Sequence, residues 1–270
     1  MLKKQEYSKT VRRPYAPLFA SIFFTGAREY AHYRGLIDEH FARRDAIISD
    51  GLWYYSKEEQ RLSGLYAYKN WIILKKFKRA KAIFLRRERK LLQATKSNFA
   101  AYCRSCEAYM PAITLCFTVD QFLESAVRKL LRKKLSSRKV NDLLDILNIP
   151  LQDNFYKREE YDLLRAKSLK AHVKKYAWLR ARYGDLTPYT MREARRRQAS
   201  INKEEFLARW HKQKQKVRAA IAYAKSIVGK QNAQHIDLMQ FLIYYRTQRS
   251  DIFNKSIYLV APILKGIARA

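Results

Sequence analysis

Apolar residues recur at helical spacing along most of this chain. From Ser56 onward they return every three or four positions, which is typical of amphipathic helices. Residues 7–55 differ, because they are rich in Tyr, Phe and Ile, and Asp50-Gly51 before the apolar run 52–55 predicts a turn that enters a short strand. The pattern predicts a mostly α protein, an irregular multi-helix bundle with a small mixed α/β N-terminal portion.

A long helix is predicted over about residues 58–96. Ser56 and Glu59 have the spacing of a capping box, in which each side chain satisfies a free backbone amide at the helix start. The apolar stripe of this helix contains one interrupting cation, Arg87, and its members are Ile73, Phe77, Ala80, Phe84 and Leu91. The other faces are almost entirely basic.

Further start and stop signals divide the rest of the chain. Thr118 with Gln121 predicts a second helix over about 118–135, and a short amphipathic helix over 140–147 ends before Pro150. Additional helices are predicted at about 158–182, 188–198 after Thr187-Pro188, 203–228 after Asn202, 235–249, and 250–268 with an interruption at Pro262. No repeat of fixed period is present. We expect residues 1–55 to pack on a bundle formed by residues 56–270, and the bundle to be one cooperative unit.

Charge indicates the class of partner. The chain has 56 Lys and Arg against 24 Asp and Glu, a formal net charge of +32 over 270 residues. A disordered basic tail is excluded, because 48% of the residues are apolar and 13% are aromatic, enough to form a core. A folded surface of one sign attracts polyanions, so nucleic acid is the expected partner, with an acidic membrane or protein as the weaker alternative.

Runs of cations without interspersed acids are the expected phosphate contacts. A solvated charged face is usually mixed in sign, and these runs are not. RNA is favoured over DNA, either as structured RNA or within a larger ribonucleoprotein, because no base-reading module such as a helix-turn-helix or zinc finger is found. The predicted nucleic-acid-binding residues are Lys75, Lys76, Arg79, Arg86, Arg87, Lys133, Lys134, Arg195, Arg196 and Arg197.

Catalytic and metal-binding motifs do not occur. The chain has no P-loop, dinucleotide fingerprint, H-E-x-x-H or G-x-S-x-G, so we expect a protein without catalytic activity or cofactor. Cys103 and Cys106 form a C-x-x-C pair, but two further ligands at zinc spacing are missing, so no metal is expected. Three cysteines, with Cys116 as the third, indicate a reducing compartment, and we expect the cytoplasm.

The beginning of the chain leaves a targeting alternative open. A basic stretch over 3–13 precedes an apolar run over 16–24 and small residues at 25–27, which has the outline of a signal peptide. Glu6, Pro14 and Pro17 disagree with that pattern, so export or organelle import is the alternative to a cytoplasmic protein. No apolar run approaches the roughly 20 residues that span a bilayer.

One local pattern carries a family resemblance. The segment His172-Val173-Lys174-Lys175-Tyr176-Ala177-Trp178-Leu179 resembles the H-x-x-x-Y-x-W-L stretch in the helical region of phosphoenolpyruvate-synthase-like, phosphoenolpyruvate-utilising proteins. The likeness continues at Tyr183, through 241–249, and to Asn254-Lys255 and Tyr258. The resemblance implies a detached helical region that acts with separately encoded catalytic partners. The family's ATP-grasp and phosphohistidine domains are not recognisable here, so no catalytic residue is carried over, and the high positive charge departs from the family pattern.

Two interpretations of the residues in these segments stay open. For the aromatic residues the alternatives are core packing, which we favour, and stacking on bases. These residues are Tyr176, Trp178, Tyr183, Tyr244, Tyr245 and Tyr258. Arg246 and Arg249 lie three apart on one helix face. One interpretation is that they clamp a phosphate, and the other is that they pair with acids such as Asp237 and Asp251.

Overall fold

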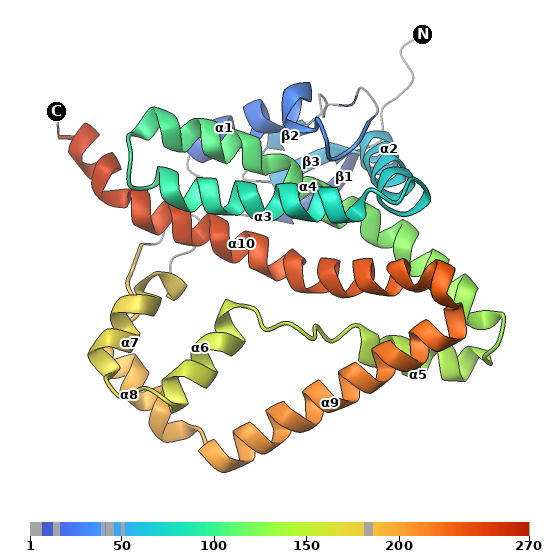
Figure 1. Cartoon of the computed structure of the whole chain (residues 1–270). Coiled ribbons are helices and arrows are strands. Elements are labelled where there is room, and N and C mark those ends of the chain that lie inside the picture. The colour runs from blue at the N-terminus through green and yellow to red at the C-terminus, as the bar shows by residue number, and fades with distance from the viewer. Residues whose placement is uncertain are drawn as a thin grey trace, which may run out of the picture. The chain divides into compact units, whose positions relative to one another are not determined.

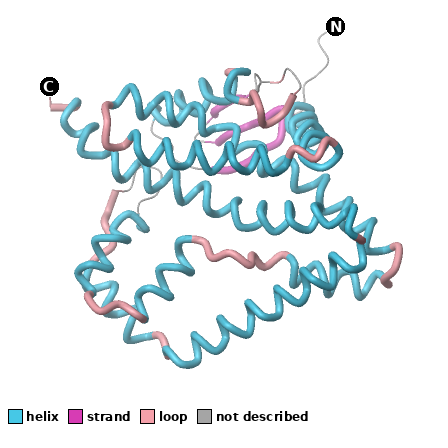
Figure 2. Tube along the Cα trace, in the orientation of Figure 1, coloured by secondary structure: helices cyan, strands magenta, loops and turns pink. Residues whose placement is uncertain are grey.

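The fold is mostly α-helical, as predicted from the apolar spacing. A computed structural model describes residues 7–12, 17–38, 41, 46–49, 52–180 and 186–269 (Figure 1; Figure 2). These residues divide into two compact units. The first unit contains the described residues up to 122 and from 252 onward, and the second contains residues 123–180 and 186–251. The division falls inside two long helices rather than at residue 55, and cooperative unfolding of residues 56–270 stays a prediction.

The first unit contains a three-stranded antiparallel sheet. Its strands are β1 (Tyr7–Arg12), β2 (Ala46–Ser49) and β3 (Leu52–Ser56), in the order β1-β3-β2. Tyr7 pairs with Ser56, Ser49 pairs with Leu52, and the register of β1 shifts between Lys9 and Val11. The predicted turn at Asp50-Gly51 lies outside the described residues.

Helices of the first unit approach one another closely at glycines. They are α1 (Pro17–Arg28), α2 (Lys57–Tyr68), α3 (Phe77–Ala94), the beginning of α4 (Phe99–Arg132) and the end of α10 (Ala233–Ile267). A Cβ at Gly64 of α2 would lie 2.3 Å from the Thr118 carbonyl oxygen of α4, and one at Gly26 of α1 would lie 2.5 Å from the Glu107 carbonyl oxygen. Only glycine allows these two backbone contacts with α4.

The predicted helix over 58–96 is wrong as one continuous helix. Ser56 caps α2 as expected, since its Oγ accepts from the Glu59 amide at 3.3 Å, but α2 passes into a π-helical segment, Lys69–Ile73. Lys75 then has a φ of 54°, a left-handed conformation that ends the helix before α3 starts. Ile73 is consequently 63% exposed instead of belonging to the apolar stripe.

Tertiary contacts around Trp71 explain that interruption. The indole Nε1 of Trp71 donates to the Leu36 carbonyl at 2.7 Å, and its ring meets Phe84 edge-on at 5.6 Å between centroids. The Asn70 side chain accepts from the Asp38 amide and donates to the Tyr66 carbonyl. These bonds position the π-helical segment against residues 36–38, at long sequence separation.

The helix predicted to begin at Thr118 is also corrected. Thr118 lies inside α4, and its hydroxyl donates to the Leu115 carbonyl at 3.2 Å instead of capping a helix start. α4 contains Pro111 and α10 contains Pro262, so neither proline ends its helix. A proline removes one backbone hydrogen bond, and packing on the remaining faces outweighs that loss here.

Five capped helices of the second unit lie in sequence between the end of α4 and the beginning of α10. They are α5 (Ser137–Leu147), α6 (Phe155–Leu164), α7 (Leu169–Tyr176) with a 3₁₀ turn (Ala177–Arg180), α8 (Met191–Ser200) and α9 (Lys203–Val228), followed by a second 3₁₀ turn (Lys230–Asn232). The 203–228 prediction and its Asn202 cap are confirmed. The 158–182 prediction is wrong as one helix, because Ser168 caps a new helix, and α8 starts after a Thr190–Glu193 capping box rather than at Pro188.

Candidate nucleic-acid interface

The solvent-facing side of α3 carries cations and no exposed acid. Ala80, Phe84 and Leu91 are buried, which fixes the opposite side of the helix toward solvent. The exposed charged residues there are Lys78, Arg79, Lys81, Arg86, Arg89 and Lys90. Glu88, the only acid of α3, is half-buried. Lys78, Arg79, Arg86, Arg89 and Lys90 form no ion pair with any described residue.

Five of the predicted contacts lie on or beside α3. Lys75, Arg79 and Arg86 are exposed as expected. Lys76 pairs with the Asp38 carboxylate, and Arg87 is half-buried with its guanidinium donating to the Ala108 carbonyl at 2.8 Å. Lys76 and Arg87 therefore have partners within the chain, which the absence of acids from the basic runs did not indicate.

The other predicted contacts occupy two places in the second unit. Lys133 and Lys134 are exposed directly after the last residue of α4, where positive charge also stabilises the helix C-terminus. Arg195 and Arg196 are exposed on α8, but Arg197 is half-buried. The sequence run Arg195–Arg197 thus contains two exposed cations and one that is half-buried.

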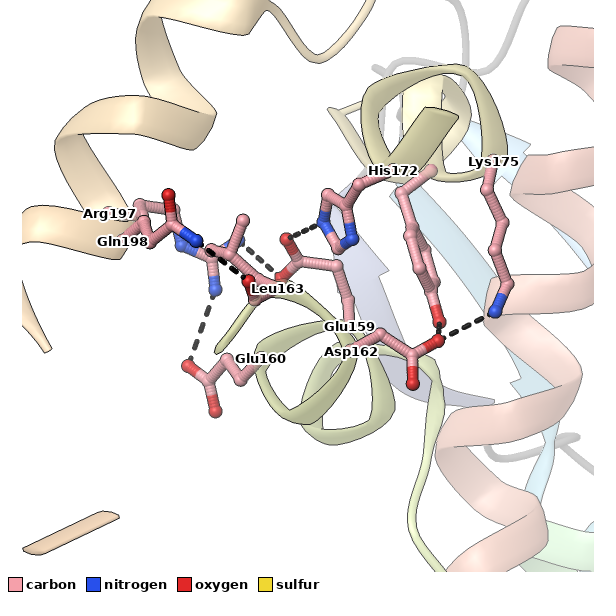
Figure 3. A network of polar contacts seen from close by, with 9 residues as sticks. Glu159, Glu160, Asp162, Leu163, His172, Lys175, Arg197 and Gln198 are labelled. Atoms are coloured by element: carbon pink, nitrogen blue, oxygen red, sulfur yellow. Dashed lines mark hydrogen bonds and ion pairs between the residues drawn. The ribbon is translucent and has the colours of Figure 1, made fainter. Parts of the chain in front are cut away.

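Arg197 takes part in a polar network centred on a fully buried glutamate (Figure 3). Arg197 donates to Glu159 Oε2 at 2.5 Å and to Glu160 Oε1 at 3.4 Å, and His172 Nε2 lies 2.9 Å from Glu159 Oε1. The Glu159 side chain is 0% exposed. Burial lowers the pKa of Arg197, but the charge and hydrogen bond of Glu159 outweigh burial and raise it above its ordinary value. The prediction that Arg197 contacts nucleic acid is therefore corrected, because its guanidinium compensates an internal carboxylate.

A second acid beside this network orders α7. Asp162 Oδ2 accepts from the Tyr176 hydroxyl and from Lys175 Nζ, both at 2.6 Å (Figure 3). Burial alone would raise the pKa of Asp162, but these two hydrogen bonds lower it below the ordinary aspartate value. Burial, followed by the Asp162 hydrogen bond, raises the pKa of Tyr176 far above the usual tyrosine range. These polar contacts link α6, α7 and α8.

The residues of the H-x-x-x-Y-x-W-L pattern are interior. His172, Tyr176, Trp178 and Leu179 are all buried, and the Trp178 ring meets Phe155 edge-on at 5.0 Å. Core packing is thereby confirmed for Tyr176 and Trp178, as it is for the buried Tyr244 and Tyr245. Tyr258 is half-buried, and Tyr183 lies outside the described residues.

Arg246 and Arg249 do not form a common surface clamp. Arg246 is exposed, whereas Arg249 is only 1% exposed. Asp237 pairs with Lys225 at 2.6 Å rather than with either arginine, and Asp251 is buried. The phosphate-clamp interpretation of this arginine pair is therefore wrong.

Sequence reasoning missed Arg104 of α4. Together with Arg87 and Lys90 of α3 it lines a hollow of about 300 Å³, whose other lining residues are Ala101, Ser105 and Ala108. The sequence signal for this position is the short connection 95–98. A connection of this length makes α3 and α4 adjacent and antiparallel, which brings Arg104 close to α3. The hollow belongs to the first unit and borders the exposed face of α3.

Other chemistry is limited in the part of the chain that the structure describes. Cys103, Cys106 and Cys116 are free thiols, and no group of three His, Cys, Asp or Glu side chains in the described ranges is arranged to hold a metal ion. None of the described helices combines the length and apolarity that crossing a bilayer requires.

Fold and surface together define a basic, mostly α-helical protein with a cationic helix face. Comparison with protein-family models, with curated proteins and with solved structures gives no match. Function therefore has to be inferred from the residues themselves.

Proposed function

We propose that this protein binds nucleic acid, with structured RNA favoured over DNA, through phosphate contacts from the exposed face of α3. The observation that carries the proposal is that this face presents Lys78, Arg79, Arg86, Arg89 and Lys90 with neither an exposed acid nor an ion-pair partner among the described residues. Like charges one helical turn apart repel, and this repulsion serves no folding purpose. A polyanion that neutralises them recovers that free energy.

Phosphate contacts predict the behaviour of the complex. Each neutralised phosphate releases condensed counterions, so affinity falls with salt, with a slope of about 0.9 per phosphate on a duplex. Phosphate contacts carry little base information, so sequence preference is weak. The shape of an A-form helix and its 2′-hydroxyls are the features that favour structured RNA.

The experiment is a fluorescence-anisotropy titration of an RNA hairpin, a DNA duplex of equal length and a single strand at several salt concentrations. The test variant replaces Lys78, Arg86 and Arg89 by Gln. A matched control removes the same charge from scattered exposed sites by replacing Lys139, Lys170 and Lys265 by Gln. We expect the α3 variant to lose most of the affinity and to flatten the salt slope, and the control to lose little. Weak affinity that does not depend on salt, or equal losses in both variants, would refute the proposal.

Other expectations from the sequence belong to the same proposal. Exposed Lys133, Lys134, Arg195 and Arg196 are proposed as additional contacts, and a larger ribonucleoprotein as the context. The free cysteines support a reducing, cytoplasmic environment. The strands β1 to β3 support our inference that residues 1–55 form a small mixed α/β portion beside the helices.

The detached helical region of a phosphoenolpyruvate-utilising phosphotransferase stays a second prediction. The residues that carry this resemblance, from His172 to Leu179, are buried in intramolecular contacts, which supports a structural role for them. Affinity purification distinguishes the two functions. The phosphotransferase prediction expects an ATP-grasp or swivelling protein in the complex, whereas the RNA proposal expects a nuclease-sensitive absorbance at 260 nm.

A further inference from the structure

The hollow between α3 and α4 gathers three cations. Arg87 and Lys90 come from α3 and Arg104 from α4, and no acidic residue is among the lining residues. Lys90 and Arg104 are exposed and form no ion pair with a described residue. Ala101 and Ala108, which also line the hollow, have small side chains that leave space between the two helices.

Arg87, one of the lining residues, is held in place by a backbone carbonyl. Its NH1 donates to the Ala108 carbonyl at 2.8 Å, so the guanidinium is oriented before a ligand arrives. Preorganisation of this kind reduces the entropy lost on binding. Ser105, half-buried in the same wall, adds a hydroxyl donor. The site therefore combines one fixed cation, two solvent-facing cations and a hydroxyl group.

Such a donor set favours a phosphate monoester over a phosphodiester. A monoester carries a charge of about −1.5 to −2 near neutral pH and has three terminal oxygens, whereas a diester within a strand carries one charge. Arginine binds phosphate through two parallel N–H bonds, and lysine adds a point charge. Three cations around one hollow match the larger charge.

We propose that this hollow binds the terminal phosphate monoester of a nucleic-acid strand, an inference that rests on the proposed function. Lys90 belongs both to the hollow and to the exposed face of α3, so the two sites are continuous. A strand whose end lies in the hollow is therefore positioned to continue along the α3 cations. The chain would then recognise ends by charge and not by sequence.

The test compares one RNA hairpin with a 5′-phosphate, a 3′-phosphate or hydroxyl groups at both ends, by anisotropy at fixed salt. We expect either terminal phosphate to tighten binding about five- to tenfold, the range of a small number of charge-assisted hydrogen bonds. Arg104→Gln should remove this gain, so that all three hairpins bind this variant with equal affinity. Lys78→Gln, on the same unit but outside the hollow, should weaken all three RNAs equally and keep the gain.

Additional measurements distinguish an RNA end from a free nucleotide as the source of the phosphate. They also distinguish failure of the end-binding inference from failure of the proposed function. Adenosine 5′-monophosphate should compete with the phosphorylated RNA and not with the hydroxyl-ended RNA. Equal affinity for all three hairpins overturns the end-binding inference and leaves the proposed function standing, whereas absence of binding to every RNA overturns both. Nucleotide binding that depends on Arg104, without a gain for phosphorylated RNA, assigns the hollow to a free phosphorylated compound and also overturns the inference. Thermal melts of Arg104→Gln should match the wild type, because this side chain is exposed.

Discussion

Arg197 offers a sharp test of the distinction between interior and surface cations. Replacing it by Met keeps most of the aliphatic stem and removes the guanidinium, which leaves the buried Glu159 carboxylate paired with His172. The neighbouring Arg196 is exposed, so Arg196→Met removes the same charge from the same helix. The pair of variants separates loss of a structural contact from loss of net charge.

The size of the effect follows from the burial of the two groups. Breaking a fully buried ion pair costs about 3–5 kcal/mol, because a charge is left unpaired in the interior. The Arg197 side chain is 32% exposed, so water can approach the carboxylate once the guanidinium is gone. We therefore expect Arg197→Met to lower the free energy of unfolding by about 2 kcal/mol, the range of a hydrogen bond to a charged group. Arg196→Met should stay within about 0.5 kcal/mol of the wild type.

Urea unfolding followed by circular dichroism measures both variants. Arg197 and Glu159 contact each other directly, so Glu159→Gln combined with Arg197→Met should cost less than the two single losses added together. RNA affinity, corrected for the folded fraction, should be the same for Arg197→Met and the wild type. A stability of Arg197→Met equal to that of Arg196→Met would refute the reasoning, and additive losses would show that the two groups do not interact.

Three further outcomes are expected. Gly64→Ala should destabilise the protein by about 1–3 kcal/mol, since its Cβ would overlap the backbone of α4, whereas Gly266→Ala, with no atom nearby, should be neutral or slightly stabilising in the same urea series. Burial lowers the pKa of His32 and of His235 below 6.5, and the charge of Arg87 lowers that of His32 further. The contribution of these histidines to stability should therefore be complete above pH 6.5 and be lost as the pH falls through their folded-state pKa values. A double His→Gln variant whose free energy of unfolding falls with pH as steeply as that of the wild type would contradict this. Burial also raises the pKa of the Cys103 thiol, so its reaction with a disulfide reagent at neutral pH should be slower in the native chain than in urea, and equal rates would exclude protection by the fold.

Local signals predicted the helices that begin at their own caps. Asn202 and Glu205 marked the start of α9 correctly, because the Asn202 side chain accepts from the Glu205 amide and no distant contact is required. The same reasoning failed at Thr118, whose hydroxyl has the right type and spacing for a cap but lies inside α4. Whether a Thr caps a helix depends on whether another helix already includes it, and α4 includes Thr118.

The interruption between α2 and α3 shows a different limit. The apolar spacing is regular across Ile73, and the π-helical segment arises from bonds of Asn70 and Trp71 to residues 36–38, which no local window contains. The candidate site shows the same limit. Net charge and the basic runs found the exposed face of α3, but they could neither separate Arg197 from Arg196 nor place Arg104 beside Lys90, because both facts depend on tertiary neighbours.

Helix order in the second unit sets a sequence of folding events. α6, α7 and α8 are consecutive and contact one another, so their pairing closes only short loops and costs little chain entropy. α5 and α9 also pack together, although the whole α6–α8 segment separates them along the chain. Their contact must close a much longer loop, and forming the α6–α8 cluster first shortens the effective length of that loop. We therefore expect the buried Glu159 to take up its partners early in folding, and the α5–α9 pairing to complete the unit afterwards.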